Sequence, residues 1–176
     1  MAPNYRSLIA GGFFSSDPFN ISVKRSIRTN NPGALNKSPW QLHFPGFVGE
    51  TPADSAGNVT AIYVTPENGA GAWYHLLTDR YGYGQSGSVK LSQLATRYAG
   101  ADSDSAPAVT GYLAGWRHWS GDQVDKESVI SMADDGRLLI LAHAMFGHEA
   151  GQRTPLQDAQ ILEGIHRKRA GTLPTS

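Results

Sequence analysis

Glu149 is the residue whose type and position most strongly suggest chemistry. It stands near the end of the apolar run LAHAMFGHE, just before the helix-breaking stretch GQRTP. A helix usually ends with Lys, Arg or Gly, because its last carbonyl groups carry partial negative charge. On a helix Met145 and Phe146 lie one turn earlier on the same face, and apolar neighbours raise the pKa of a carboxyl group. A general acid needs such a pKa at neutral pH; the alternative, which the local pattern alone favours, is an exposed Glu at a frayed helix end.

His148 does not complete a zinc-protease motif with Glu149. That motif, H-E-x-x-H, places two histidines one turn apart, whereas this chain has HEAGQ. His143 lies five residues before His148, which is about 140° away around a helix. We therefore expect no metal site and no cofactor, and we take His148 as a candidate for contact with substrate.

Asn30 and Asn31, in the stretch RTNNPGAL, are the candidates for substrate binding at the other end of the chain. Their short amide side chains carry donors and acceptors that suit the hydroxyl and acetamido groups of a sugar. Pro32 holds Asn31 in an extended conformation. Asn-Pro-Gly is also ordinary turn chemistry, and spacing alone favours the plain turn.

Three further acids are lesser catalytic candidates. Glu67 falls in the first turn of an expected helix, where an acidic side chain complements the helix dipole without any catalytic role. Glu50 and Asp54 lie in or beside an expected strand-turn-strand segment. A glycosidase with two carboxylates needs a partner for its acid, and either residue could serve, although acids in hairpins are usually solvated.

Aromatic side chains at helical spacing are the remaining candidates for a sugar-binding surface. Stacking on sugar faces is one role for them, but packing in the core is the commoner one. We take Tyr98 as the cleft residue of this group, whose members are Tyr98, Tyr112, Trp116 and Trp119.

Length and composition limit the possible functions. The 176 residues predict one domain with a proper core. Fifteen basic and fifteen acidic side chains cancel, which gives no reason to expect a nucleic-acid partner or membrane insertion. The chain has no Cys, so disulfides and cysteine zinc sites are excluded. The apolar run from Leu8 to Phe14 is too weak for a secretory signal and too short to span a membrane, so a substrate outside the cytoplasm would require another delivery route.

Short strands followed by helices are expected to position these candidates. Residues 47–51 and 58–65 predict two strands joined by the turn PADSAG, and Thr65 and Pro66 then begin a helical pattern. The fold class is therefore expected to be α+β and mainly helical, with a small N-terminal sheet. We expect a lead segment at 1–25, a domain at 26–170 and a tail at 171–176. Further helices are predicted near 88–99, through 106–119, over roughly 128–132 or starting later through 134–149, and after Pro155.

Four segments, in this order, resemble phage-type lysozyme-like domains. RTNNPGAL is similar to their Arg-x-Asn-Asn-Pro-Gly-Asn motif, and VTPENGAGAWYHLL to their Thr-Pro-Glu-x-Gly helix start. LATRYAGADSDSAPAVTGYLAGW resembles their Tyr-Ala-Pro segment and the helix that follows it. AMFGHEAGQRTPLQDAQILEGI resembles their closing His-Glu-x-Gly element. Two positions depart from the family pattern, since Ala34 replaces its Asn after Pro-Gly, and Gly100 replaces the Pro of Tyr-Ala-Pro.

The resemblance implies a circularly permuted lysozyme fold, because the sheet-like segment precedes the helix that ends in Glu149. Peptidoglycan glycoside hydrolase effectors of type VI secretion systems share that permutation. Glu149 matches the catalytic acid of the family, Asn30 and Asn31 its Asn pair, and Glu67 its Thr-Pro-Glu glutamate.

The activity implied is cleavage of β-1,4 glycan bonds in peptidoglycan, as a muramidase, an N-acetylglucosaminidase or a lytic transglycosylase. A non-catalytic peptidoglycan-binding or phage virion structural module is the alternative. As an antibacterial effector, the protein would be secreted without a classical signal peptide and would act in the periplasm of a target bacterium. Its implied partners are peptidoglycan, the secretion apparatus and a periplasmic immunity protein.

Overall fold

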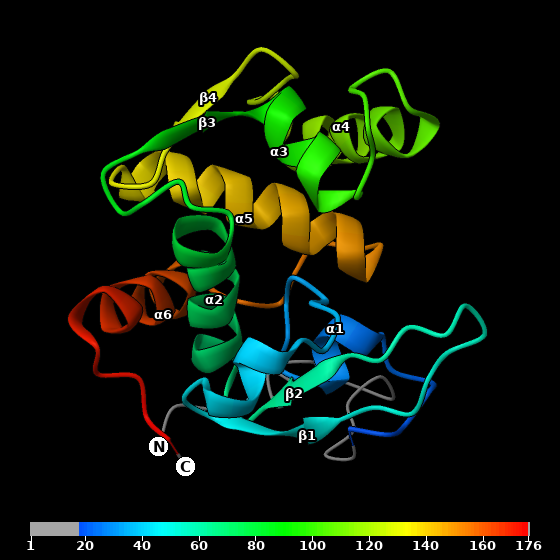
Figure 1. Cartoon of the computed structure of the whole chain (residues 1–176), viewed down its shortest axis with the longest axis vertical. Helices are drawn as coiled ribbons and strands as arrows, with labels where there is room; N and C mark the ends of the chain where they lie inside the picture. Colours follow the sequence, from blue (N-terminus) through cyan, green and yellow to red (C-terminus); the bar gives the residue numbers. More distant parts are fainter. Residues whose placement is uncertain (1–17, 176) are drawn as a thin grey trace. The chain divides into compact units, whose positions relative to one another are not determined.

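Six α-helices and two small antiparallel sheets make up the part of the chain that the computed structural model describes, residues 18–175 (Figure 1). The expected class, α+β and mainly helical, is confirmed. The first part of the expected lead segment, residues 1–17, lies outside the described residues. No described helix is both long enough and apolar enough to cross a membrane.

Contacts between residues divide the expected domain at 26–170 into two compact units. Unit 1 combines the described residues up to Leu76 with those from Thr154 onward, and unit 2 comprises Leu77–Arg153. The chain passes from unit 1 into unit 2 within a π-helical turn, η4 (Leu76–Arg80), and returns after Arg153.

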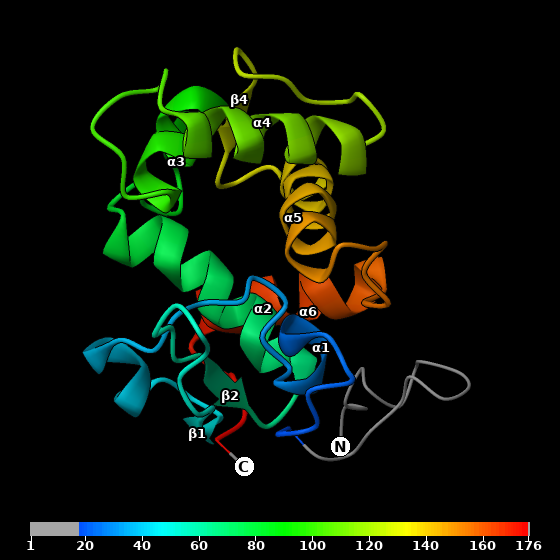
Figure 2. The same cartoon turned by 90° about the vertical axis from the view of Figure 1, so that its right-hand side faces the viewer.

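Helices α2 (Pro66–His75) and α6 (Asp158–Ala170) form the centre of unit 1, and Figures 1 and 2 show α6 lying across α2. As predicted, Thr65 caps α2, since its hydroxyl accepts a hydrogen bond from the Asn68 N–H at 3.2 Å, and Pro66 is the first helical residue. Gly164 permits the close approach of the two helices, because a Cβ there would overlap the Glu67 carbonyl oxygen and lie 3.0 Å from the Ala70 Cβ.

The predicted strand-turn-strand segment is present in unit 1. Strands β1 (Phe47–Glu50) and β2 (Ala61–Tyr63) pair in antiparallel register, with Phe47 opposite Tyr63 and Glu50 opposite Ala61. The short helix α1 (Arg25–Arg28) and a 3₁₀ turn, η3 (Pro39–His43), precede the sheet.

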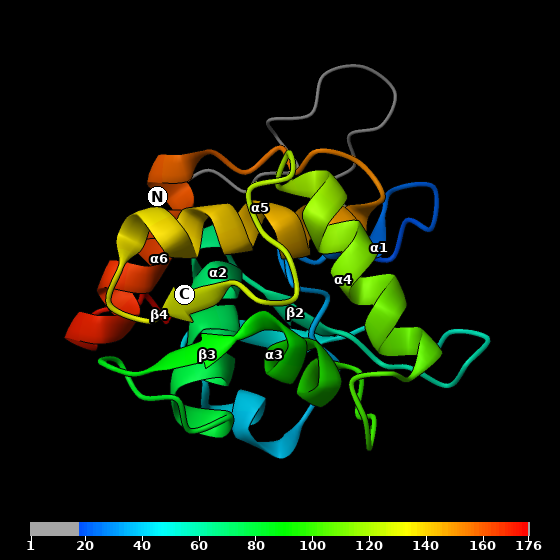
Figure 3. The same cartoon turned by 90° about the horizontal axis from the view of Figure 1, so that it is seen from above.

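Unit 2 consists of three helices and a second two-stranded antiparallel sheet. Helix α3 (Leu91–Tyr98) is followed by α4 (Pro107–Trp119) and α5 (Asp135–Ala150), and α4 passes across α5 in Figures 2 and 3. Strands β3 (Ser88–Lys90) and β4 (Val129–Ser131) lie side by side in antiparallel register (Figure 3).

This second sheet corrects one prediction and decides between the alternatives of another. The helix predicted near 88–99 begins only at Leu91. Residues 129–131 form a strand, so the next helix takes the later of its two predicted starts and begins at Asp135. Val89 and Ile130 are the buried central residues of the two strands and pair with each other. A three-residue segment with a single buried residue is too short for its pattern to distinguish a strand from one turn of helix.

Replacement of Gly164 tests the α2–α6 contact. In an exposed helix Gly→Ala stabilises by up to about 1 kcal/mol. In Gly164→Ala we expect the opposite, a loss of about 1–3 kcal/mol in the free energy of unfolding, because α2 and α6 must separate. Urea denaturation measures it. Gly111→Ala on α4 is the matched control, since its added methyl group meets nothing within 4 Å, and equal effects of the two changes would contradict the contact.

Candidate active site at the end of helix α5

Glu149 is the last residue but one of α5, and its position follows from the local sequence. Asp134 begins the helix by accepting a hydrogen bond from the Arg137 N–H at 3.0 Å. Gly151 ends it in the left-handed conformation, at φ 62°, which glycine adopts without strain. Between these caps, Leu138, Leu141 and other apolar side chains bury one side of the helix. The carboxyl group is therefore fixed at the point where α5 stops.

Aromatic rings of unit 2 gather beside this helix end. The Tyr98 ring, at the end of α3, meets the Tyr112 ring of α4 edge-on, with centroids 5.4 Å apart. Tyr112 in turn lies 5.8 Å from Trp116 and 5.1 Å from the imidazole of His148. We call Tyr98, Tyr112, Trp116 and His148 the aromatic cluster. Tyr98 and His148 thus lie in one cluster of unit 2, and their predicted contact with substrate stays a prediction.

Burial raises the pKa of Glu149 to about 7. Met145 and Phe146, the apolar residues one turn earlier, are both fully buried, as the sequence predicts. The pKa of Tyr98 and of Tyr112 is also raised, first by burial and then by the charge of Glu149, so both phenols lie close to the carboxyl group. The raised pKa favours the protonated carboxyl group, which is the state that a general acid requires.

Asn30 and Asn31 lie in the core of unit 1. The Asn31 Nδ2 donates to the carbonyl oxygens of Leu35 (3.0 Å) and Ala61 (2.9 Å), and its Oδ1 accepts from the Leu35 N–H. The Asn30 Nδ2 donates to the Tyr63 carbonyl oxygen at 3.0 Å. Both residues are at most 1% exposed. These contacts favour a structural role for both side chains, which hold the β2 strand in place, and their contact with substrate stays a prediction.

Glu67 lies in the first turn of α2, as predicted, and its side chain is buried against α6. Its Oε1 accepts a hydrogen bond from Gln160 Nε2 at 3.3 Å, while its Oε2 has no partner among the described residues. Burial is the main cause that raises the pKa of Glu67. Glu67 lies in unit 1, where its side chain is part of the contact between α2 and α6.

Glu50 and Asp54 both form ion pairs in unit 1. Glu50 pairs with Lys37 at 3.2 Å on the surface. Asp54 pairs with Arg25 at 2.8 Å and accepts hydrogen bonds from the backbone N–H groups of Ala56 and Asn58, which close the turn between β1 and β2. The Asn58 bond is the first cause that lowers the pKa of Asp54. These contacts favour a structural role, and pairing of either acid with Glu149 stays a prediction.

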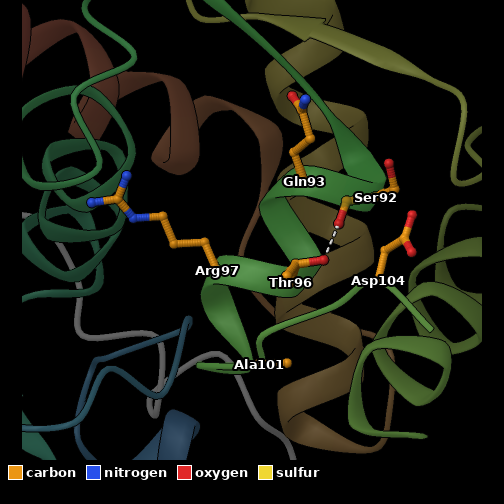
Figure 4. A pocket seen from close by; sticks show the side chains of 6 residues that line it. All are labelled: Ser92, Gln93, Thr96, Arg97, Ala101 and Asp104. Carbon is orange, nitrogen blue, oxygen red and sulfur yellow. Dashed lines mark hydrogen bonds between the residues drawn. The ribbon is translucent and has the colours of Figure 1, made fainter. Parts of the chain in front are cut away.

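A shallow pocket of about 390 Å³ lies elsewhere on unit 2 (Figure 4). The Thr96 hydroxyl at its floor donates to the Ser92 carbonyl oxygen at 2.7 Å. Arg97 points away from Asp104 and lies over the Tyr81 ring at 4.4 Å. Asp104 is exposed, so the pocket offers no buried acid. Its lining residues are Ser92, Gln93, Thr96, Arg97, Ala101 and Asp104.

Two glycines in the contact between α4 and α5 were not predicted to have a structural role. Gly115 on α4 and Gly147 on α5 lie where the two helices touch, and each is an isolated glycine inside an apolar helical pattern. That pattern is the signal that could have identified them, since glycine weakens a helix and has to be explained by packing. Over residues 18–175 no group of three or more acidic or histidine side chains is arranged to hold a metal ion.

Comparison with known proteins adds no relative. No protein-family model matches the chain, and no curated protein matches it.

Replacement of Asn31 tests its structural role. Asn31→Ala removes three hydrogen bonds and leaves the buried Leu35 and Ala61 carbonyl groups short of a donor, so we expect a loss of about 2–4 kcal/mol in the free energy of unfolding. Urea denaturation measures the loss. Asn58→Ala is the control, since the side chain of Asn58 is exposed and accepts one weak bond from Asn36 at 3.4 Å. A loss no larger than that of the control would count against the role.

The raised pKa of Glu149 also predicts how stability depends on pH. Between its ordinary pKa and about 7 the folded protein holds this proton more tightly than the unfolded chain, so ionisation costs stability as pH rises through that range. Glu149→Gln removes that cost. We expect the variant to melt at a higher temperature than the wild type at pH 8 and at the same temperature at pH 4. Equal melting shifts at both pH values would contradict the raised pKa; Glu127→Gln, an exposed change in unit 2, is the control.

Proposed function

We propose that the protein is a glycoside hydrolase that cleaves β-1,4 bonds in the glycan strands of peptidoglycan, with Glu149 as its general acid. The observation that supports this most directly is the environment of Glu149. Burial raises the pKa of Glu149 to about 7, and the carboxyl group is held at a helix end beside the rings of Tyr98 and Tyr112. The similarity of four segments, in order, to lysozyme-like domains agrees with the same assignment.

In this proposal the Glu149 proton passes to the oxygen that links two sugars. The C1–O bond then breaks, one sugar leaves with a free hydroxyl group, and positive charge develops on the ring of the other. Water can add to C1 and return a proton to the Glu149 carboxylate, which completes hydrolysis. A hydroxyl group of the same sugar can add instead and return the proton, which gives the anhydro product of a lytic transglycosylase.

The aromatic cluster supplies two features that this chemistry needs. Sugar rings present C–H faces that pack on aromatic side chains, and the Tyr98 and Tyr112 rings lie near enough to the acid for its charge to raise the pKa of both phenols. The same rings reduce the access of water to the carboxyl group and so keep its proton available at neutral pH. A module that only binds peptidoglycan needs no acid of this kind.

The proposal extends to the biological setting that the sequence resemblance implies. The lysozyme-like fold with permuted order and the role of an antibacterial effector belong to it. So do secretion without a classical signal peptide, action in the periplasm of a target bacterium, and a periplasmic immunity protein as partner.

Digestion of purified peptidoglycan tests the proposal. We expect the wild type to release soluble glycan fragments, Glu149→Gln to release them at least about 100-fold more slowly, and Glu127→Gln to match the wild type. The rate should fall as pH rises above about 7, because the carboxyl group loses its proton there. Mass spectrometry of the new ends distinguishes a muramidase, a glucosaminidase and a transglycosylase.

Two outcomes would contradict the proposal. Full activity of Glu149→Gln would show that another group is the acid. Binding of the wild type to peptidoglycan without any release of fragments would identify a binding module instead.

A further inference from the structure

The contact between α4 and α5 is built from two glycines, each beneath an aromatic side chain of the other helix. A Cβ at Gly115 of α4 would overlap the Nδ1 of His148 and lie 2.6 Å from its Cε1. A Cβ at Gly147 of α5 would lie 3.0 Å from both the Cβ and the Cγ of Trp119. The imidazole therefore sits directly on the backbone of α4, and the indole sits on the backbone of α5.

His148 is held on a second side by the aromatic cluster. Its ring lies 5.1 Å from the Tyr112 ring, at an angle of 51°. Burial lowers the pKa of His148, which favours the neutral form of the imidazole beside the acid. Tyr112 thus touches His148 and also lies close to the carboxyl group of Glu149.

The last turn of α5 needs such a restraint. The final residues of a helix lack part of their backbone hydrogen bonds and fray readily. Glu149 is one residue from the end, and its ionised form is repelled by the negative end of the helix dipole. Without contacts that hold this turn, the side chain would move into water and lose its buried environment.

We propose that His148 is a positioning residue for Glu149: seated on Gly115 and packed against Tyr112, it fixes the end of α5 so that the carboxyl group stays beside Tyr98 and Tyr112. This role differs from the contact with substrate expected from the sequence. The inference rests on the proposed function only where activity is the readout, because the placement of the carboxyl group can be measured without substrate.

Three variants separate positioning from other roles. Gly115→Ala keeps His148 in the chain but pushes the imidazole off α4, and His148→Ala removes the imidazole. His148→Gln restores an uncharged, planar group of similar reach without the aromatic ring. Gly111→Ala is the matched control on α4, one turn earlier, where an added methyl group meets nothing within 4 Å. Circular dichroism confirms that each variant is folded.

Carbon-13 NMR of the Glu carboxyl groups across pH gives the first readout, with the Glu149 resonance identified by its absence from Glu149→Gln. In Gly115→Ala and His148→Ala we expect the pKa of Glu149 to fall from about 7 toward its ordinary value of about 4.3. His148→Gln should restore part of the difference, and Gly111→Ala should leave the pKa unchanged. An unchanged pKa in folded Gly115→Ala and His148→Ala overturns the inference.

Kinetics on peptidoglycan give the second readout. We expect kcat to fall about 10-fold to 100-fold in the same two variants with little change in KM, since a misplaced acid slows the chemical step. A rise in KM alone, with kcat kept, would show that His148 contacts substrate and would overturn the inference. If the wild type releases no fragments, the proposed function fails, while the NMR titration still decides whether His148 positions Glu149.

Discussion

The partial removal of one carboxyl group from water is the constraint around which unit 2 is organised. An ionised Glu149 at the negative end of α5 is unfavourable both because it is buried and because of the helix dipole. Both effects act in the same direction and favour the protonated form. In our inference the contact with α4 holds the end of α5 and so keeps this half-buried side chain in place.

Unit 1 uses its buried polar groups in a different way. The amide groups of Asn30 and Asn31 bond to backbone carbonyl groups of β2 and its neighbours, so the sheet is fixed by side chains as well as by strand pairing. Gly164 allows α2 and α6 to approach until their backbones nearly touch, with Glu67 buried at the contact. Polar residues that suggest a binding site in the sequence therefore serve in unit 1 as internal supports.

Features that depend on residues close in the sequence could be predicted, whereas features that depend on distant residues could not. The strands around residues 47–63 and the Thr65 cap depend on neighbours close in sequence, and both were predicted. For Glu149 the local pattern left an exposed side chain as the alternative. The β3–β4 sheet and the burial of Asn31 depend on partners about 30 or more residues away. The seat of His148 on Gly115 likewise joins residues on different helices, and no local pattern encodes such a contact.

The environment of Glu149 also means that its carboxyl group lowers the stability of the folded protein at pH values where it ionises. A glutamine at position 149 would fill the same space without any charge, so stability alone gives no reason for the acid at pH values where it ionises. Two helix-interior glycines add a further cost, since each weakens its own helix by up to about 1 kcal/mol relative to alanine. A carboxylate at a helix end and two glycines inside the adjoining helices each depart from local stability rules, and such departures at one place agree with the proposed function. The α4–α5 contact is thus best understood as the support of an acid that the fold would be more stable without.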